Sequence, residues 1–106
     1  MIPDVLLVIS TFPDAETAGR IARELVIEKL AACANIAQPV HSIYRWQGKV
    51  EDASETMVFF KTTPQRFAGF QAKLRSLHPY DVPEIISLPV PDGLPDYLRW
   101  VSESCS

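Results

Sequence analysis

The sequence predicts an α+β fold in which strands and helices follow in the order β-α-β-β-α-β, with a short helix after the last strand. Three observations indicate this order: apolar runs of strand length, two stretches with apolar residues at helical spacing, and prolines and glycines between them. A chain of 106 residues can bury one compact core. We therefore expect residues 1–106 to form a single domain.

The first two predicted elements are a buried strand and an amphipathic helix. Residues Val5 to Phe12 are nearly all apolar or β-branched, and Pro13 closes the run. Asp14 suits a helix N-cap, and apolar residues then recur at helical spacing, at Ala18, Ile21, Ala22, Leu25, Val26 and Leu30. This pattern predicts a helix over Asp14 to Ala32.

A long hairpin is predicted next. The pattern is β-like from Cys33 to Trp46, and Gln47-Gly48 can form a tight turn. Val50 and the apolar run from Met57 to Phe60 then belong to the partner strand. These segments form the second and third strands.

The remaining elements are a helix, a strand and a short helix. Thr63 followed by Pro64 is typical of a helix start, and apolar residues repeat at helical spacing up to Pro79, at Phe67, Phe70, Leu74 and Leu77. Glu84 to Val90 is the fourth predicted strand. A turn follows at Pro91, Gly93 and Pro95, and the last helix contains Tyr97, Leu98, Trp100 and Val101.

Two prolines predict the strand order. Proline has no backbone N–H for a sheet ladder, so it is confined to edge strands, strand starts and bulges. Pro39 falls in the second strand and Pro89 in the fourth, whereas the first and third strands have no internal proline. The predicted antiparallel sheet therefore has the order 4-1-3-2, which is the ferredoxin-like arrangement.

The central strands carry apolar residues on both faces, although both helices of this topology cover the same face. Val5 to Ile9 and Met57 to Phe60 show no polar alternation. We expect another subunit to cover the second face. The alternatives are a strand register shifted by one residue and a face that stays partly exposed.

Charge and composition exclude several classes of protein. The net charge is −3 and the basic residues are scattered, so we expect no nucleic-acid partner. The apolar run Val5 to Ile9 is too short for a signal peptide core or a membrane span, which predicts a cytoplasmic protein without a membrane partner. Cys33 and Cys105 show no zinc spacing, and we expect both to be reduced.

Five segments resemble the CutA family of divalent cation tolerance proteins: Glu28 to Ile36, Ser42 to Gly48, Phe60 to Thr63, His78 to Glu84 and Asp96 to Trp100. They occur in the family's order and cover nearly the whole chain. The resemblance implies a ferredoxin-like subunit in a homotrimer and a link to tolerance of divalent cations, including copper. It also implies a fold kinship with trimeric PII signalling proteins.

The same resemblance indicates a metal site that has changed in this chain. Copper binding in the family is attributed to a cysteine in the first strand and two successive histidines before a Pro-Tyr segment. These positions correspond here to Ser10, Leu77 and His78, so a hydroxyl replaces the thiolate. His78 is a candidate ligand, and the alternative is a helix-end cap or hydrogen-bonding group. The expected cofactor is a weakly bound divalent ion, Cu²⁺ or Zn²⁺, and none is essential.

His41 is a second candidate metal ligand. It lies on an edge strand, and the partner strand of the hairpin carries Glu51 and Glu55. Imidazole and carboxylates together can hold a divalent ion. The alternative is solvated polarity that protects the edge from aggregation.

Four polar residues are predicted to line a cleft between subunits: Lys61, Tyr80, Glu84 and Glu55. They could orient a metal ion or a small anionic ligand, and the alternative is an ion pair between Lys61 and Glu84 that seals the trimer. Three aromatic residues are predicted to anchor the trimer interface: Tyr44, Trp46 and Trp100.

The function expected from these residues is a trimeric CutA-like protein that binds a metal ion or small ligand between subunits. The alternatives are a PII-like regulator that binds a nucleotide and a trimeric scaffold without metal function. Thr11 to Asp14 lacks the arginine of an acylphosphatase-type loop, so we expect no enzyme activity. Glu55 to Thr62 is acidic and then apolar, unlike the basic and aromatic strand of RNA recognition motifs.

Overall fold

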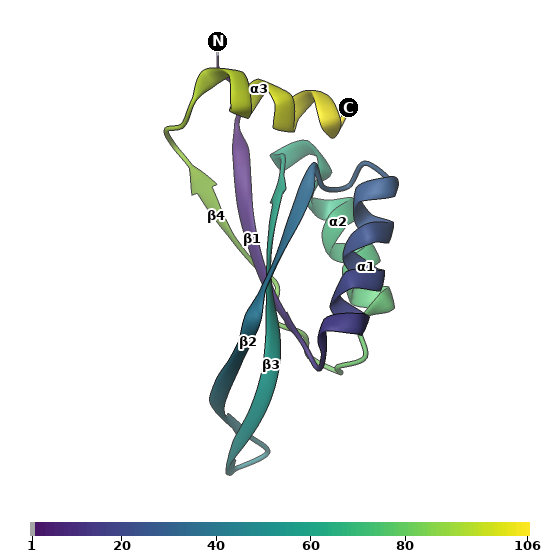
Figure 1. Ribbon diagram of the computed structural model, residues 1–106, viewed down its shortest axis with the longest axis vertical. Helices are drawn as coiled ribbons and strands as arrows, with labels where there is room; N and C mark the ends of the chain where they lie inside the picture. Colours follow the sequence, from purple (N-terminus) through teal and green to yellow (C-terminus); the bar gives the residue numbers. More distant parts are fainter. Residues whose placement is uncertain (1) are drawn as a thin grey trace.

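The computed structural model describes residues 2–106 and contains the predicted elements in the predicted order (Figure 1). Their bounds are β1 Val5–Phe12, α1 Ala15–Ile27, β2 Cys33–Trp46, β3 Lys49–Thr62, α2 Pro64–Leu77, β4 Ile86–Val90 and α3 Pro95–Ser104. Among residues 2–106, no helix is long and apolar enough to cross a membrane.

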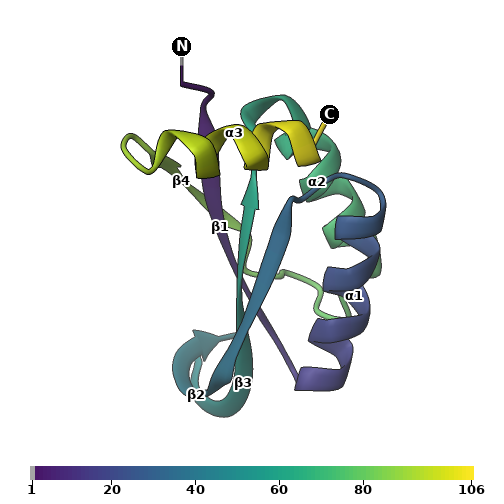
Figure 2. The same cartoon turned by 45° about the horizontal axis from the view of Figure 1, so that its top comes forward.

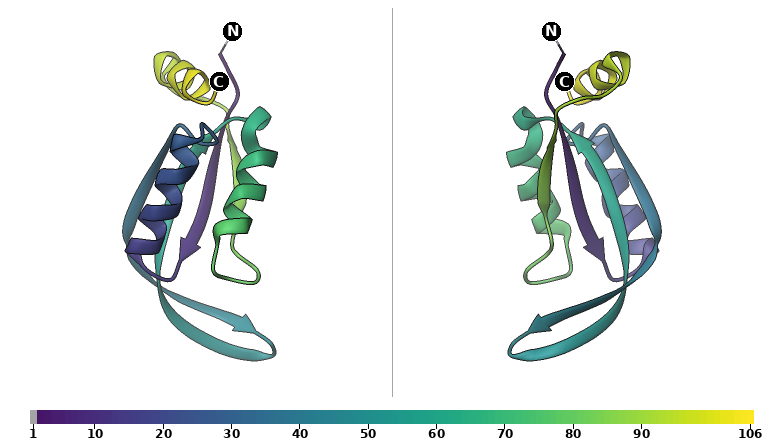
Figure 3. Two further views of the ribbon diagram at one scale, coloured as in Figure 1. Left: turned by 90° about the vertical axis from the view of Figure 1, so that its right-hand side faces the viewer. Right: turned by 90° about the vertical axis from the view of Figure 1, so that its left-hand side faces the viewer.

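The sheet has the strand order β2-β3-β1-β4, and each neighbouring pair is antiparallel. This confirms the order predicted from the prolines, because Pro39 and Pro89 lie in the two edge strands. Figure 3 shows α1 and α2 side by side on one face of the sheet. The arrangement is the predicted ferredoxin-like one.

Helix α1 ends earlier than predicted, at Ile27 instead of Ala32. The chain leaves the helix because Lys29 adopts a left-handed conformation, with φ of 61°. The amides of Lys29 and Leu30 then donate to the carbonyl oxygens of Val26 and Leu25, each at 3.0 Å. This is a Schellman motif with lysine at the position where glycine is usual. The residue pattern therefore did not reveal where the helix ends.

The β2–β3 hairpin turns at Gln47 and Gly48, as predicted. Both residues have positive φ, 50° and 80°, which matches a two-residue type I′ turn. A register shift between Ile36 and Pro39 marks a bulge in β2. The tip of the hairpin projects beyond the rest of the subunit (Figure 1). The whole subunit, with the hairpin included, measures 48 × 25 × 23 Å.

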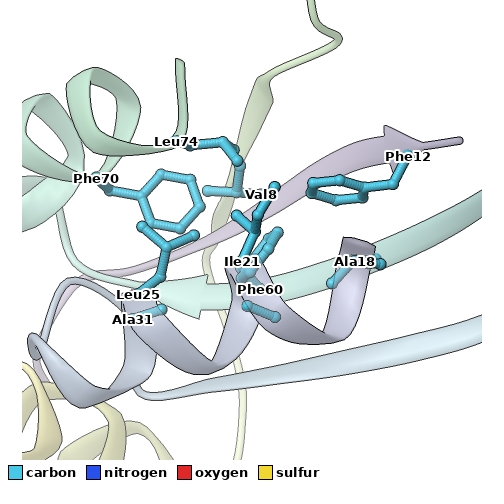
Figure 4. Close-up of a cluster of buried hydrophobic side chains, with 11 residues drawn as sticks. Val8, Phe12, Ala18, Ile21, Leu25, Ala31, Phe60, Phe70 and Leu74 are labelled. Carbon is cyan, nitrogen blue, oxygen red and sulfur yellow. The ribbon is translucent and has the colours of Figure 1, made fainter. Parts of the chain in front are cut away.

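The main core lies between the sheet and the two helices (Figure 4). From β1 it receives Val8 and Phe12, which are fully buried. Phe60 of β3 meets Phe70 of α2 edge to face, with ring centroids 5.0 Å apart. Strand β4 begins at Ile86, two residues later than predicted, where its pairing with Ile9 of β1 begins.

Helix α3 packs across one end of the sheet, above β1 and β3 (Figure 2). It contributes Leu98 and Val101 to a second apolar cluster, which also contains its C-cap residue Cys105 together with Val5 and Ala32. This cluster covers only the end of the sheet that lies farthest from the hairpin tip.

The sheet face opposite α1 and α2 is apolar. Paired residues point to the same side of a sheet, and the register therefore gathers six apolar side chains there: Leu7, Ile9, Met57, Phe59, Ile86 and Leu88. We call this set the open sheet face. Ile86 and Leu88 are 50% and 44% exposed, and the other four are half-buried. The subunit itself therefore leaves this face partly uncovered.

The positive φ of Lys29 leads to a stability prediction. Replacing Lys29 with glycine removes the steric cost of the left-handed conformation, and we expect Lys29→Gly to stabilise the fold by about 1 kcal/mol. Urea unfolding followed by circular dichroism measures this change. The matched control is Arg23→Gly at an exposed position inside α1, which should destabilise by about 1 kcal/mol. A loss of stability in Lys29→Gly would contradict the left-handed conformation of Lys29.

Candidate functional site

A pocket of about 540 Å³ opens between the hairpin and the loop that follows α2. We call it the acidic pocket, and it is lined by Thr11, Ser42, Ile43, Tyr44, Trp46, Glu55, Tyr80, Asp81, Val82 and Glu84. By the sheet register, the β2 and β3 side chains Ser42, Tyr44 and Glu55 lie on the same side as the open sheet face. The pocket therefore adjoins the open sheet face, because Thr11, which lines the pocket, pairs with Met57 of that face.

Tyr80 and Glu55 form the central contact of the acidic pocket. The Tyr80 hydroxyl donates a hydrogen bond of 2.8 Å to Oε2 of Glu55. Burial and this carboxylate raise the pKa of Tyr80 far above its ordinary value, so the phenol stays protonated and remains a donor. The bond joins the loop after α2 to strand β3.

Glu84 adds a second carboxylate to the pocket. Burial raises the pKa of Glu84, and the nearby charge of Glu55 raises it further. Asp81 also lines the pocket, whereas no lysine, arginine or histidine does. The lining therefore favours a positively charged ligand, because a cation would relieve the repulsion between carboxylates.

His78 positions the loop that carries Tyr80. It is 7% exposed, and its Nε2–H donates to the backbone oxygen of Thr11 at 2.8 Å. Its Nδ1 accepts from the backbone N–H of Tyr80 at 3.1 Å, and its ring stacks on Phe12 at 4.8 Å. Burial lowers the pKa of His78, so the ring is neutral at pH 7. Both ring nitrogens are occupied, and binding a metal would break one of these bonds.

None of the three predicted metal ligands lines the acidic pocket. Ser10 is fully buried in β1, and its hydroxyl has no hydrogen-bond partner within the described chain. His41 is exposed on the hairpin, where its Nε2 lies 2.7 Å from Oδ1 of Asp52. The sheet register explains this partner, because the predicted Glu51 and Glu55 point to the opposite face from His41.

The subunit does not present a ready metal cage. Over residues 2–106, no three His, Cys, Asp or Glu side chains are grouped closely enough to hold a metal ion. The acidic pocket is lined by three carboxylates and a phenol, of which Glu55 and Tyr80 are in direct contact.

Lys61 lies apart from the other predicted cleft residues. It is in β3, opposite Leu7 of β1, and its ammonium group donates to the side-chain oxygen of Asn35. The alternative ion pair between Lys61 and Glu84 is not present in the subunit, where the described ion pairs involve other residues. Of the four predicted cleft residues, the structure brings Glu55, Tyr80 and Glu84 together.

The aromatic residues predicted at the trimer interface occupy two places. Tyr44 and Trp46 line the acidic pocket and are 44% and 42% exposed. Trp100 lies on α3, where its ring centroid is 5.6 Å from that of Tyr97. Their role at an interface stays a prediction.

Sequence analysis missed Asp81 as a lining residue, although its position between Tyr80 and Glu84 was a usable signal.

The fold and the pocket define a class of protein: a ferredoxin-like α+β subunit with an uncovered apolar sheet face and an acidic pocket beside it. The family profile described as "CutA1 divalent ion tolerance protein" matches residues 6–104. The chain therefore belongs to the CutA1 family, as its sequence motifs predicted.

Relatives and solved structures agree with this membership. The chain is 45% identical to the divalent-cation tolerance protein CutA of Thermus thermophilus, over 92% of this chain and 95% of the relative. It is 44% identical to the CutA homolog of Xenopus laevis, over 88% of this chain but 62% of that longer protein. The structure of CutA from Xylella fastidiosa superposes with a TM-score of 0.93 at 41% identity, over 96% of this chain and 98% of that one.

The lowered pKa of His78 predicts a pH-dependent stability. As pH falls below about 6.5, the unfolded chain binds a proton on this ring and the folded chain does not, so stability is lost. We expect the fall in unfolding free energy between pH 7.5 and pH 5 to be smaller in His78→Gln than in the wild type, measured by urea unfolding. Equal slopes in the two proteins would contradict the buried neutral ring.

Proposed function

We propose that the chain is a homotrimeric, non-enzymatic protein of divalent cation tolerance that binds a divalent ion in the acidic pocket. One observation carries the proposal: the pocket gathers Glu55, Asp81 and Glu84 beside a sheet face that the subunit leaves uncovered. Family membership supports the link to divalent ions. Copper binding, assembly into a trimer and a cytoplasmic location are parts of this proposal.

The open sheet face supports self-association. Ile9 and Phe59 lie opposite each other at the centre of the sheet, and no helix of the described chain covers that face. Contiguous apolar surface of this kind is typical of subunit interfaces. Because the acidic pocket adjoins this face, a neighbouring subunit packed there would close the pocket into a cleft.

The donor atoms of the pocket support a weakly bound ion. Carboxylate oxygens bind most divalent ions, and a site of nitrogen and oxygen donors binds Cu²⁺ more tightly than Zn²⁺ or Mn²⁺. The absence of a thiolate at Ser10 and the occupied nitrogens of His78 limit the affinity. We therefore propose Cu²⁺ or Zn²⁺ as an exchangeable ligand and not as a structural cofactor.

The charge of the pocket weighs against nucleotide binding. A nucleotide site needs basic side chains or glycine-rich backbone around the phosphates, whereas this lining carries three carboxylates and no basic residue. A trimeric scaffold without metal function is the second candidate. The scaffold function is favoured if the only role of the carboxylates is to hold the loop after α2, through the hydrogen bond between Glu55 and Tyr80.

The assembly proposal predicts a particle with three times the subunit mass of 11.9 kDa. Size-exclusion chromatography with light scattering measures it. Phe59→Lys places a charge on the open sheet face and should dissociate the particle. Ile27→Lys changes an equally apolar residue that is 71% exposed on α1, and it should leave the mass unchanged. A folded wild-type monomer would contradict the proposal.

The metal proposal predicts saturable binding of Cu²⁺ and weaker binding of Zn²⁺, measured by isothermal titration calorimetry. Glu84→Gln should weaken binding about tenfold, which corresponds to about 1.4 kcal/mol. Glu103→Gln, on the exposed side of α3, removes the same charge elsewhere and should have no effect. Equal binding by both variants would exclude the acidic pocket as the site, and a lack of saturable binding by the wild type would leave the scaffold function.

A further inference from the structure

A second pocket lies at the other end of the subunit, where the N-terminal segment, the start of α2 and the end of α3 meet. Its volume is about 680 Å³. We call it the α2–α3 pocket, and it is lined by Ile2, Pro3, Asp4, Thr63, Gln65, Arg66, Ser102, Cys105 and Ser106. The proposed metal function uses none of these residues.

Arg66 supplies the positive charge of the α2–α3 pocket. Its Nε–H donates to the backbone oxygen of Cys105 at 2.5 Å, which fixes the guanidinium between α2 and α3. Among the described residues, Arg66 forms no ion pair with an acidic side chain. The two terminal NH₂ groups therefore remain free to bind an anion, and their planar fork suits an oxyanion.

Thr63 is a second, independent feature of the pocket. It occupies the N-cap position of the 14-residue helix α2 and is 4% exposed, yet its hydroxyl makes no capping hydrogen bond. An N-cap threonine ordinarily accepts a bond from an amide of the first turn. Here Thr63 lines the pocket beside Gln65 and Arg66, at the helix end that attracts negative charge.

The remaining lining groups add donors and one opposing charge. Ser102 and Ser106 carry hydroxyl groups, and that of Ser106 donates to the backbone oxygen of Ser102 at 2.9 Å. Burial raises the pKa of the Cys105 thiol, so its sulfur stays neutral at pH 7. Asp4 is the one acidic side chain of the described lining.

We propose that the α2–α3 pocket binds a small tetrahedral oxyanion of the phosphate class, held by the Arg66 guanidinium, the Thr63 hydroxyl and the Gln65 amide in the first turn of α2. The ligand is free phosphate or the phosphate group of a monoester, since both present the same oxygens. This site goes beyond the proposed metal function, because it lies at the opposite end of the subunit and takes a ligand of opposite charge.

Titration of the full chain with inorganic phosphate, and separately with glycerol 3-phosphate, tests the proposal. Chloride at equal ionic strength is the reference. We expect saturable shifts of the Gln65 and Arg66 amide resonances in NMR spectra. Tighter binding of the ester identifies a monoester ligand, and tighter binding of phosphate identifies the free anion. Non-specific anion binding should be weak, because the net charge of the chain is −3, so a saturable shift reports a specific site. The lack of a saturable shift with both compounds overturns the proposal.

Three variants locate the binding. Arg66→Gln should weaken phosphate binding at least roughly tenfold, and Thr63→Val, which keeps the side-chain shape, roughly threefold to tenfold. Arg75→Gln removes the same charge from the last turn of α2 and should bind as the wild type does. The amide spectrum of each variant reports its fold before titration, and Thr63→Val disturbs no cap. Equal weakening by Arg66→Gln and Arg75→Gln overturns the proposal.

Discussion

Strand β1 and the Met57 to Phe60 part of β3 are apolar on both faces, while α1 and α2 cover only one of them. The covered face builds the core around Val8, Phe12 and Phe60. The uncovered face leaves Ile9 and Phe59 half-buried at its centre. A small domain has little spare burial with which to offset such exposure, and this cost is the physical basis of the association proposed above.

His78 connects this core to the acidic pocket. Its ring stacks on Phe12 of the core, and its two nitrogens bind the backbones of Thr11 and Tyr80. Tyr80 in turn holds Glu55 through its hydroxyl. A residue that sequence analysis considered as a metal ligand thus serves to orient the pocket, and the carboxylates beyond it line that pocket.

Local chemistry made most of the fold predictable. Proline exclusion from central strands placed Pro39 and Pro89 at the edges, and the Gln47-Gly48 turn followed from the need for positive φ. The stop of α1 was not predictable, because Lys29 takes a conformation that its residue type disfavours. The pairing of His41 with Asp52 depends on register after a bulge, which no residue pattern specifies.

The long hairpin has a consequence for how ligand and assembly interact. Part of the wall of the acidic pocket, Tyr44 and Trp46, belongs to a hairpin arm that extends beyond the core of its own subunit. An arm of this kind is held in place mainly by whatever it packs against. By thermodynamic reciprocity, a ligand that contacts the arm and favours its docked position strengthens association, and association raises the affinity for that ligand by the same factor. The occupancy of the acidic pocket and the stability of the oligomer would then rise and fall together.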